Sequence, residues 1–205
     1  MTDTIGWAVS REDDPALAKV SKKPGTYLYP LPPSLITCGP ADKPNIITLA
    51  WVGILCSDPP IIGVSIRPSR YSHSLVKQFG EFAVNIPTAE MVRVVDWCGT
   101  VSGHSEDKFA AMGLTAVPTQ VIRTVLIRDC PVNIECQVVQ TIHLGSHDLF
   151  LGKVVAVQVD ETILDARGEI DLGKANPLAY GSHSYWTLGQ CVERQGYTAS
   201  PEEGT

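Results

Sequence analysis

The sequence of 205 residues lacks long apolar runs and basic clusters, and both absences exclude large classes of protein. Its longest apolar stretch, Ile46–Cys56, is too short for a membrane-spanning helix, which needs roughly 20 residues. Sixteen Lys and Arg stand against 22 Asp and Glu, a net charge of −6, which argues against general nucleic-acid binding but allows a local anion site. The first residues do not form a secretory signal, so we expect a soluble, cytoplasmic protein.

The sequence also lacks the motifs of several common sites. No two of its cysteines are spaced as CxxC, and we expect all six to be reduced and mostly buried: Cys38, Cys56, Cys98, Cys130, Cys136 and Cys191. GxGxxG, GxxxxGK[ST], GxSxG and HExxH are absent. His143 and His147 are four residues apart, but in a strand end and turn this spacing does not bring two ligands together, so we expect no metal site.

What is present is a body built mostly of short strands. The composition, 44% hydrophobic, predicts a globular chain that folds as one large domain. We expect an arm at residues 1–23, a body at residues 24–194 and a flexible tail at residues 195–205. Apolar patterns predict strands over residues 34–39, 45–55, 61–67, 82–86, 121–128, 132–141 and 149–159, with a hairpin turn at residues 166–168.

Three helices are inserted singly among these strands. Ser69 or Ser72 would cap one that runs to Phe79, and a second follows Thr88. Ser105 would cap a third, residues 106–112, which Gly113 ends. Strands and helices do not alternate regularly, so the pattern favours a mainly β fold, a closed antiparallel barrel with a few peripheral helices. Gly53, Gly63 and Gly152 within strands suggest barrel bends or close approach of backbone or ligand.

The segment Arg67–Ser72 is the strongest candidate for an anion site. It follows a strand, opens a helix and offers two guanidinium groups, Arg67 and Arg70, with hydroxyls and free backbone N–H groups. A phosphate could be held there by charge-assisted hydrogen bonds and by the helix N-terminus. The alternative is an ordinary capped loop with solvated arginines.

Other residues have a structural interpretation beside the functional one. In residues 48–53, small residues surround Trp51, which would let a flat ring lie against the backbone, although Trp51 could equally pack in the core. Lys108 follows the polar loop Ser102–Asp107 and could reach a ring carbonyl or a phosphate, or face water. His147 stands at a turn, where a histidine is more often structural.

Taken together, these segments resemble the flavin reductase-like family, and within it the flavoredoxin-type FMN-binding proteins. The resemblance covers about residues 24–190. The stretches that carry it are Pro33–Gly39, Asn45–Gly53, Pro59–Pro60, Ser65–Arg67, Arg70–Ser72, Glu81–Pro87, Ser102–Gly103 with Asp107–Phe109, and Tyr185–Gly189. Each is weak alone, but their order and spacing are specific.

The resemblance implies an FMN-binding split β-barrel, usually a homodimer, that holds FMN non-covalently. The cofactor-binding residues that we expect from the residues and the resemblance are Asn45, Thr48, Ala50, Trp51, Val52, Gly53, Ser65, Arg67, Arg70, Tyr71, Ser72, Asn85, Ser102, Gly103, Lys108, His147 and Tyr180. We expect Asn45 and the amides near Gly53 at the polar edge of the flavin ring, and Lys108 to raise the flavin potential.

Some positions depart from the pattern of the family. Where it often has Gly-Asp-His, this chain has Gly145-Ser-His147, so the carboxylate beside the histidine is absent. Tyr180 stands where other aromatic residues occur in the family, and Ser72 stands where Thr or Ser is typical.

The leading hypothesis for function is an NAD(P)H-dependent flavin reductase. NAD(P)H, a transient substrate, would pass a hydride to the flavin N5, and the electrons would go on to a second flavin, a metal complex or a partner protein. Because the cofactor carries this chemistry, no acid–base pair is needed, and His147 is the single candidate catalytic residue. The alternatives are an FMN-binding electron carrier that does not use NAD(P)H and a flavin-storage or sensing protein.

Overall fold

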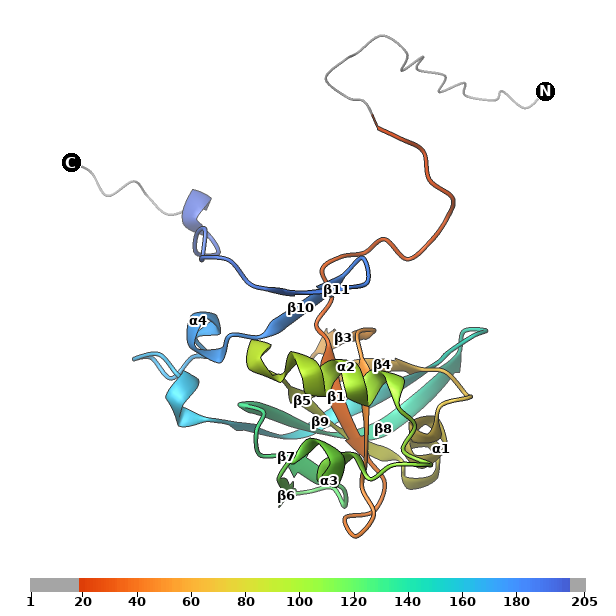
Figure 1. Cartoon of the computed structure of the whole chain (residues 1–205). Helices are drawn as coiled ribbons and strands as arrows, with labels where there is room; N and C mark the ends of the chain where they lie inside the picture. Colours follow the sequence, from red (N-terminus) through yellow and green to blue (C-terminus); the bar gives the residue numbers. More distant parts are fainter. Residues whose placement is uncertain (1–18, 200–205) are drawn as a thin grey trace, which may run out of the picture.

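A seven-stranded antiparallel sheet forms the body of the chain (Figure 1). The computed structural model describes residues 19–199; the remaining parts of the predicted arm and tail, residues 1–18 and 200–205, lie outside the described residues. The strands are β1 (Ser34–Cys38), β2 (Asn45–Leu49), β3 (Val52–Ser57), β4 (Pro60–Ile66), β5 (Glu81–Ile86), β8 (Val132–His143) and β9 (Asp148–Val159). Their order is β2-β1-β5-β8-β9-β4-β3, so the predicted mainly β fold is confirmed.

The sheet curls into a split barrel because consecutive strands lie at its opposite edges. β2 and β3 are separated only by Ala50 and Trp51, yet β2 pairs with β1 and β3 pairs with β4. The Ser65 N–H donates to the Trp51 carbonyl at 3.1 Å, which extends the pairing of β3 with β4 to Trp51, so the two edges of the sheet are joined directly by this short link. The single strand predicted over residues 45–55 is therefore wrong: neither Gly nor Pro marks the break, and the apolar run continues through it.

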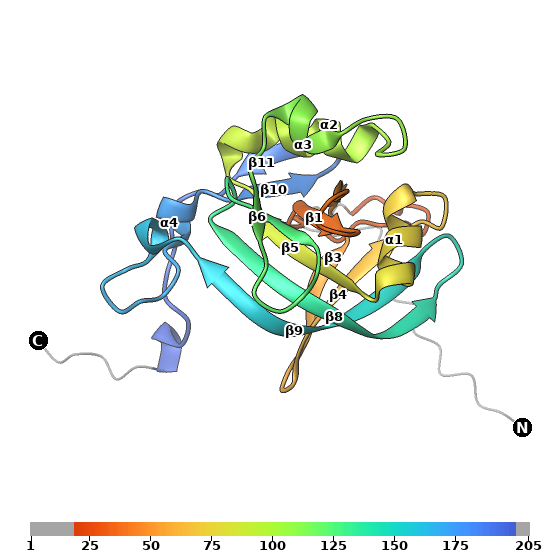
Figure 2. The ribbon, with the colours of Figure 1, turned by 90° about the horizontal axis from the view of Figure 1, so that it is seen from below.

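Apolar side chains fill the inside of the curl and the space under the helices. The inner cluster contains Ile36, Val64, Phe82 and Phe150, with Val76 of α1 (Tyr71–Phe79). Burial of such a side chain stabilises the fold by about 1.5–3 kcal/mol. Figure 2 shows the long, curved pair β8 and β9 that supports this core.

Two of the three glycines predicted to allow close approach do so. A Cβ atom at Gly152 would lie 2.5 Å from Cζ of Phe82, and one at Gly63 would lie 2.6 Å from Cδ1 of Leu55. Gly53 has open space at this position.

A second cluster packs helices against the other face of β1 and β2. Leu35 and Ile46 contact Val95 and Cys98 of α2 (Val92–Thr100) and Phe109 of α3 (Lys108–Met112). The Thr48 hydroxyl also donates to the carbonyl of Val95. The second predicted helix is thus confirmed, and it holds one end of β2 in place.

The predicted helix caps differ from those observed. α1 begins after Arg70, and no side chain caps it, so the expected Ser69 or Ser72 cap is wrong. α3 begins after Asp107, whose Oδ1 accepts from the N–H groups of Phe109 and Ala110. Ser105 instead donates its hydroxyl to the carbonyl of Ser102 in the preceding turn.

The predicted strand over residues 121–128 is shorter than expected. Only Val125–Ile127 (β7) is extended, and it pairs with Ala116–Pro118 (β6) in a separate two-stranded sheet. The loop before β7 is held instead by Glu135, whose carboxylate accepts from the N–H groups of residues 120–122. The sequence pattern missed this because apolar residues of the loop also reach the core.

The remaining elements lie outside the seven-stranded sheet. They are α4 (Leu172–Ala175), β10 (Leu178–Gly181), β11 (Ser184–Thr187) and short 3₁₀ turns at Ala89–Met91, Glu161–Ile163 and Tyr197–Ala199. A bridge between Leu164 and Ile170 closes the predicted turn at residues 166–168. All six cysteines are unpaired; four are buried, while Cys56 is half-buried and Cys191 is exposed. Within residues 19–199, no helix is long and apolar enough to cross a membrane.

Candidate functional site

Two adjoining cavities lie where the edges of the sheet approach each other. The larger, about 330 Å³, is lined by Ile47, Thr48, Leu49, Ala50, Trp51, Ser65, Arg67, Arg70, Gly99, His147 and Tyr180. The smaller, about 150 Å³, is lined by Ile47, Ser69, Arg70, Tyr71, Ser72, Cys98, Gly99, Val101, Ser102, Gly103 and Lys108. Both linings include Ile47, Arg70 and Gly99, so these residues mark the junction of the two cavities.

Two cations stand in the lining of the smaller cavity. Lys108 is 4% exposed, and its Nζ donates to the carbonyls of Ile46 and Cys98, each at 2.8 Å. These two bonds leave the third ammonium hydrogen for a ligand. Arg70 supplies the second positive charge. No Asp or Glu among the described residues lines this cavity, so its charge is suited to an anion.

Hydrogen bonding around Ser72 leaves a further donor at the smaller cavity. The Asn45 amide Nδ2 donates to Ser72 Oγ at 2.7 Å, which leaves the hydroxyl hydrogen of Ser72 able to donate to a ligand. Ser72 lies in the first turn of α1, whose N-terminus no side chain caps. Backbone N–H groups at such a terminus favour negative charge and add to the two cations.

Burial shifts the pKa values of Lys108 and of the neighbouring Cys98. Burial lowers the pKa of Lys108 below 10.5, and the nearby positive charge of Arg70 lowers it further. Burial raises the pKa of Cys98 to about 11, so its thiol is protonated at neutral pH. A bound anion would therefore compensate Lys108 directly, because neither neighbouring thiol carries charge.

The larger cavity has a flat, partly aromatic wall. The rings of Trp51 and His147 lie 4.5 Å apart between centroids, tilted by 46°. The ring of Tyr180 from β10 borders the cavity and packs 5.5 Å from Tyr185. Such surfaces suit a planar ring. The Trp51 side chain is 40% exposed, so the core-packing alternative for this residue does not hold.

His147 lies on the wall of the larger cavity, in the turn between β8 and β9. Ser146 Oγ lies 2.9 Å from Nδ1 of His147, so a hydroxyl contacts the ring in this chain. Burial, and then the positive charge of Arg67, lower the pKa of His147 below 6.5. The imidazole is therefore neutral at pH 7, and it offers the cavity a polar, uncharged group.

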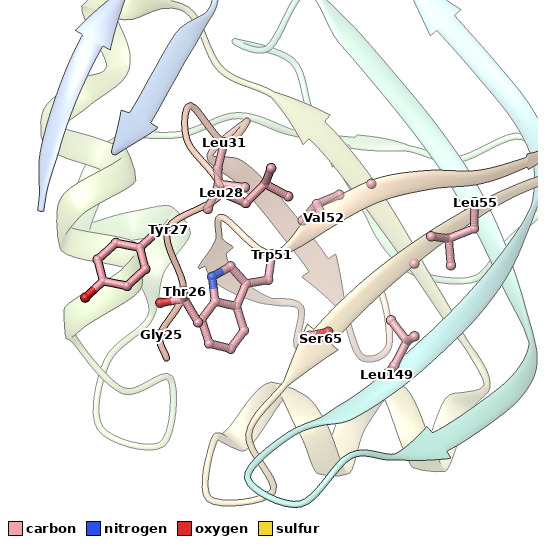
Figure 3. A pocket seen from close by; sticks show the side chains of 12 residues that line it. Gly25, Thr26, Tyr27, Leu28, Leu31, Trp51, Val52, Leu55, Ser65 and Leu149 are labelled. Carbon is pink, nitrogen blue, oxygen red and sulfur yellow. The ribbon is translucent and has the colours of Figure 1, made fainter. Parts of the chain in front are cut away.

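A third cavity, of about 400 Å³, lies on the other side of Trp51 (Figure 3). Its lining is mostly apolar and shares Trp51 and Ser65 with the larger cavity of the site. Figure 3 shows the Trp51 ring near its centre, with Tyr27 and Leu28 on one side and Leu55 and Leu149 on the other. We call this the apolar cavity.

The structure brings most of the expected site residues together. Eight line the larger cavity: Thr48, Ala50, Trp51, Ser65, Arg67, Arg70, His147 and Tyr180. Arg70 is joined in the smaller cavity by Tyr71, Ser72, Ser102, Gly103 and Lys108, and Asn45 lies behind Ser72. Val52 and Gly53 line the apolar cavity.

Some placements differ from the expectation. Asn85 is fully buried away from the cavities, and its Nδ2 donates to the carbonyl of Leu35 at 2.9 Å while its Oδ1 accepts from Ile127 N–H. Lys108 and Asn45 lie at the smaller cavity rather than beside the larger one.

Sequence reasoning missed several residues that line the site. Gly99 and Ile47 border both cavities, and Cys98 borders the smaller one. Gly99 lies near the end of α2, and a Cβ there would meet Thr48 Cβ at 3.3 Å. None of these residues is polar or charged enough to stand out in the sequence as a candidate for the site; only the helix predicted after Thr88 pointed to this region.

The two cavities fit the parts of FMN, the cofactor that the sequence resemblance implies. A flavin ring is planar and would suit the larger cavity, while a phosphate would suit the donors and cations of the smaller one. The fit rests on the arrangement of donors: Arg70, Lys108, Ser72 and the N-terminus of α1 all offer hydrogens toward one small space. A bound phosphate would accept them.

Comparison with known proteins gives consistent matches. The flavin reductase like domain matches residues 25–189. An uncharacterized protein of Archaeoglobus fulgidus is 40% identical over 157 residues, 77% of this chain and 88% of that protein. Flavoredoxin of Desulfovibrio vulgaris (Miyazaki F) is 34% identical with a TM-score of 0.83, covering 89% of this chain and 100% of its own. An FMN-binding protein from Thermus thermophilus, solved with bound 1-cyclohex-2-enone, is 27% identical with a TM-score of 0.74, covering 87% and 98%.

Proposed function

The chain belongs to the flavin reductase-like domain family, and on this premise we propose that it is an FMN-dependent oxidoreductase. It binds FMN non-covalently in the two adjoining cavities. NAD(P)H serves as a transient electron donor, and a second flavin, a metal complex or a partner protein serves as acceptor.

The main observation in support of this proposal is that the smaller, cationic cavity adjoins the larger cavity, which could hold a flat ring. Lys108 and Arg70 stand at the smaller cavity, and Trp51 and His147 border the larger one. FMN has its phosphate and its ring at opposite ends of a flexible chain, so it can occupy both cavities at once. The FMN-binding relative from Thermus thermophilus supports this assignment.

The residues of this chain would bind and orient the cofactor. Bound FMN supplies the redox chemistry, hydride acceptance at N5 and later release of electrons. Lys108, Arg70 and Ser72 would hold the phosphate, while Trp51 and the neutral His147 would border the ring and limit water there.

The test is anaerobic stopped-flow reduction of the FMN-loaded protein by NADH and by NADPH. We expect the absorbance of oxidised flavin to bleach with at least one donor, and to return when an acceptor is added. If neither donor bleaches the flavin while dithionite does, the reductase activity is refuted, although FMN binding stands.

A second candidate function for this chain is that of an FMN-binding electron carrier that does not use NAD(P)H directly, and the likeness to a protein named flavoredoxin favours it. For such a carrier, light-driven reduction of bound FMN would succeed where NAD(P)H fails. Reoxidation by an added partner protein, rather than by free flavin, would distinguish the carrier from a storage protein.

We also propose a homodimer, supported by large apolar side chains that remain exposed near the apolar cavity. Tyr27 and Leu28 are 62% and 81% exposed, and Ile54 and Leu55 are 82% and 54% exposed. Covering these side chains by a second copy would remove a large apolar surface from water. Light scattering should report a dimer, and Leu28→Asp should shift it toward monomer. The six free thiols fit the cytoplasmic location that we propose.

A further inference from the structure

The far end of the smaller cavity is covered by the segment that connects α2 to α3. The residues that the smaller cavity does not share with the larger one form this far end, among them Tyr71, Ser102 and Gly103. We call residues 102–105 the roof segment. Ser102 and Gly103 of this segment line the smaller cavity and not the larger one, so the segment borders the cavity away from the junction.

Direct contacts hold the roof segment against the cavity. The His104 ring lies on the ring of Tyr71, 4.0 Å between centroids and tilted by 36°. A Cβ atom at Gly103 would lie only 1.8 Å from Asn45 Oδ1, so the backbone packs as closely on Asn45 as a residue without a side chain allows.

Hydrogen bonds within the roof segment fix its shape. The N–H of His104 donates to Ser102 Oγ at 3.2 Å, and the N–H of Ser105 donates to the Ser102 carbonyl at 3.2 Å. The segment is therefore a tight turn with one aromatic contact to α1, at Tyr71, and one backbone contact to the start of β2, at Asn45.

Charge and size at this end favour one class of phosphate. A phosphate monoester carries about −1.5 to −2 at pH 7, and it matches the two cations Arg70 and Lys108. A phosphate within a dinucleotide carries one charge and is followed by a second phosphate, a ribose and a base. The cavity of about 150 Å³, which Ser102 and Gly103 help to line, has space for the phosphate of a monoester but not for the second phosphate, ribose and base of a dinucleotide.

We propose that the roof segment, latched by His104 on Tyr71, makes this site select a flavin monophosphate over a flavin dinucleotide. The inference rests on the proposed function and names the residues that determine its cofactor specificity. Gly103 sets how closely the segment approaches Asn45, and His104 holds the segment against Tyr71 of α1. Neither residue needs to contact the flavin ring.

The experiment compares dissociation constants for FMN, FAD and riboflavin in the wild type and two variants, by quenching of flavin fluorescence. His104→Ala removes the ring contact with Tyr71, and Gly103→Ala pushes the segment away from Asn45. We expect the wild type to prefer FMN over FAD by at least about tenfold. Each variant should lower the ratio of the FAD dissociation constant to the FMN dissociation constant by about two- to tenfold, which for His104→Ala is the effect of losing one aromatic contact. The dissociation constant of riboflavin should stay unchanged.

A matched control is Glu106→Gln, an exposed position beside the roof segment. It should leave the FMN to FAD ratio at the wild-type value, and thermal unfolding should show that all three variants are folded. If the wild type binds FMN and FAD equally, or if His104→Ala and Gly103→Ala both keep the wild-type ratio, the roof segment does not select the cofactor. If the wild type binds no flavin at all, the proposed function itself fails.

Discussion

Asp148 Oδ2 lies 2.7 Å from Nε2 of His73, and this contact joins the start of β9 to α1 across 75 residues of chain. Both side chains are buried, and Oδ1 of the same carboxylate lies 2.8 Å from Nδ1 of the exposed His143. His73 follows Ser72 of the smaller cavity, and Asp148 follows His147 of the larger one. One carboxylate therefore fixes two walls of the site relative to each other.

We predict that Asp148 makes the stability of the fold depend on pH in acid. Hydrogen bonds from His143 and then His73 lower the pKa of Asp148 below 3.8. Its contribution to the free energy of unfolding is therefore complete above the unfolded value. It is lost as the pH falls through the lower, folded value. Urea unfolding measured from about pH 5 downward should show this loss in the wild type and not in Asp148→Asn.

The control for this prediction is His143→Gln, which removes the exposed partner and keeps the buried contact between His73 and Asp148. It should retain part of the acid loss, because one of the two hydrogen bonds remains. Parallel stability curves for the wild type and Asp148→Asn would contradict the role of this carboxylate.

Arg70 and Arg67 are expected to act differently on flavin binding. Arg70 lines both cavities, whereas Arg67 lines only the larger one. Arg70→Ala should therefore weaken FMN binding about tenfold more than riboflavin binding, the effect of one charge-assisted hydrogen bond. Arg67→Ala should change the affinities for both ligands by the same factor. Fluorescence titration of the single and double variants checks this, and equal losses for the two ligands in Arg70→Ala would refute the phosphate assignment.

Lys108 should make FMN binding fall in alkali. Burial lowers its pKa below 10.5, so the ammonium loses its proton at a lower pH than an exposed lysine does. Because only the charged form attracts phosphate, FMN affinity should decrease as the pH rises through this lowered value, and riboflavin affinity should not. Lys108→Met should remove this alkaline decrease and weaken FMN binding by about tenfold or more at neutral pH. An unchanged alkaline decrease in the variant would show that another group causes it.

Much of the site could be predicted from the sequence because many of its residues are neighbours in the chain. Arg70, Tyr71 and Ser72 are neighbours in the chain, and a strand followed by a helix places them at a helix N-terminus whatever the rest of the fold does. The polar loop before Lys108 was likewise visible as a turn entering a helix. Local patterns of this kind predict which residues form a site.

What the sequence could not provide are relationships that depend on the curl of the sheet. The break at Ala50 and Trp51 lies within an apolar run, so no residue type marks the point at which the chain moves from one edge to the other. Asn85 has the same polarity as Asn45, but one lies in a buried amide network and the other behind Ser72. The two asparagines are told apart only by the strand pairing, which places Asn45 opposite Cys38 and Asn85 opposite Leu35 on the two sides of β1.

The last prediction concerns stability away from the site. Glu135 is fully buried, and its carboxylate accepts from the N–H groups of Gln120, Val121 and Ile122 at 2.7, 2.8 and 3.1 Å. Glu135→Gln replaces one acceptor oxygen by an NH₂ group, so at least one N–H group of this loop loses its partner. The free energy of unfolding should fall by about 1–3 kcal/mol.

FMN affinity should stay at the wild-type value in Glu135→Gln, because none of the residues of this loop lines the two cavities of the site. Urea unfolding and flavin titration of the same preparation measure the two effects separately. Glu161→Gln, which changes an acid in the 3₁₀ turn after β9, is the control and should alter neither quantity. A variant Glu135→Gln as stable as the wild type would mean that the loop finds other acceptors, and a loss of FMN affinity would mean that the loop supports the site after all.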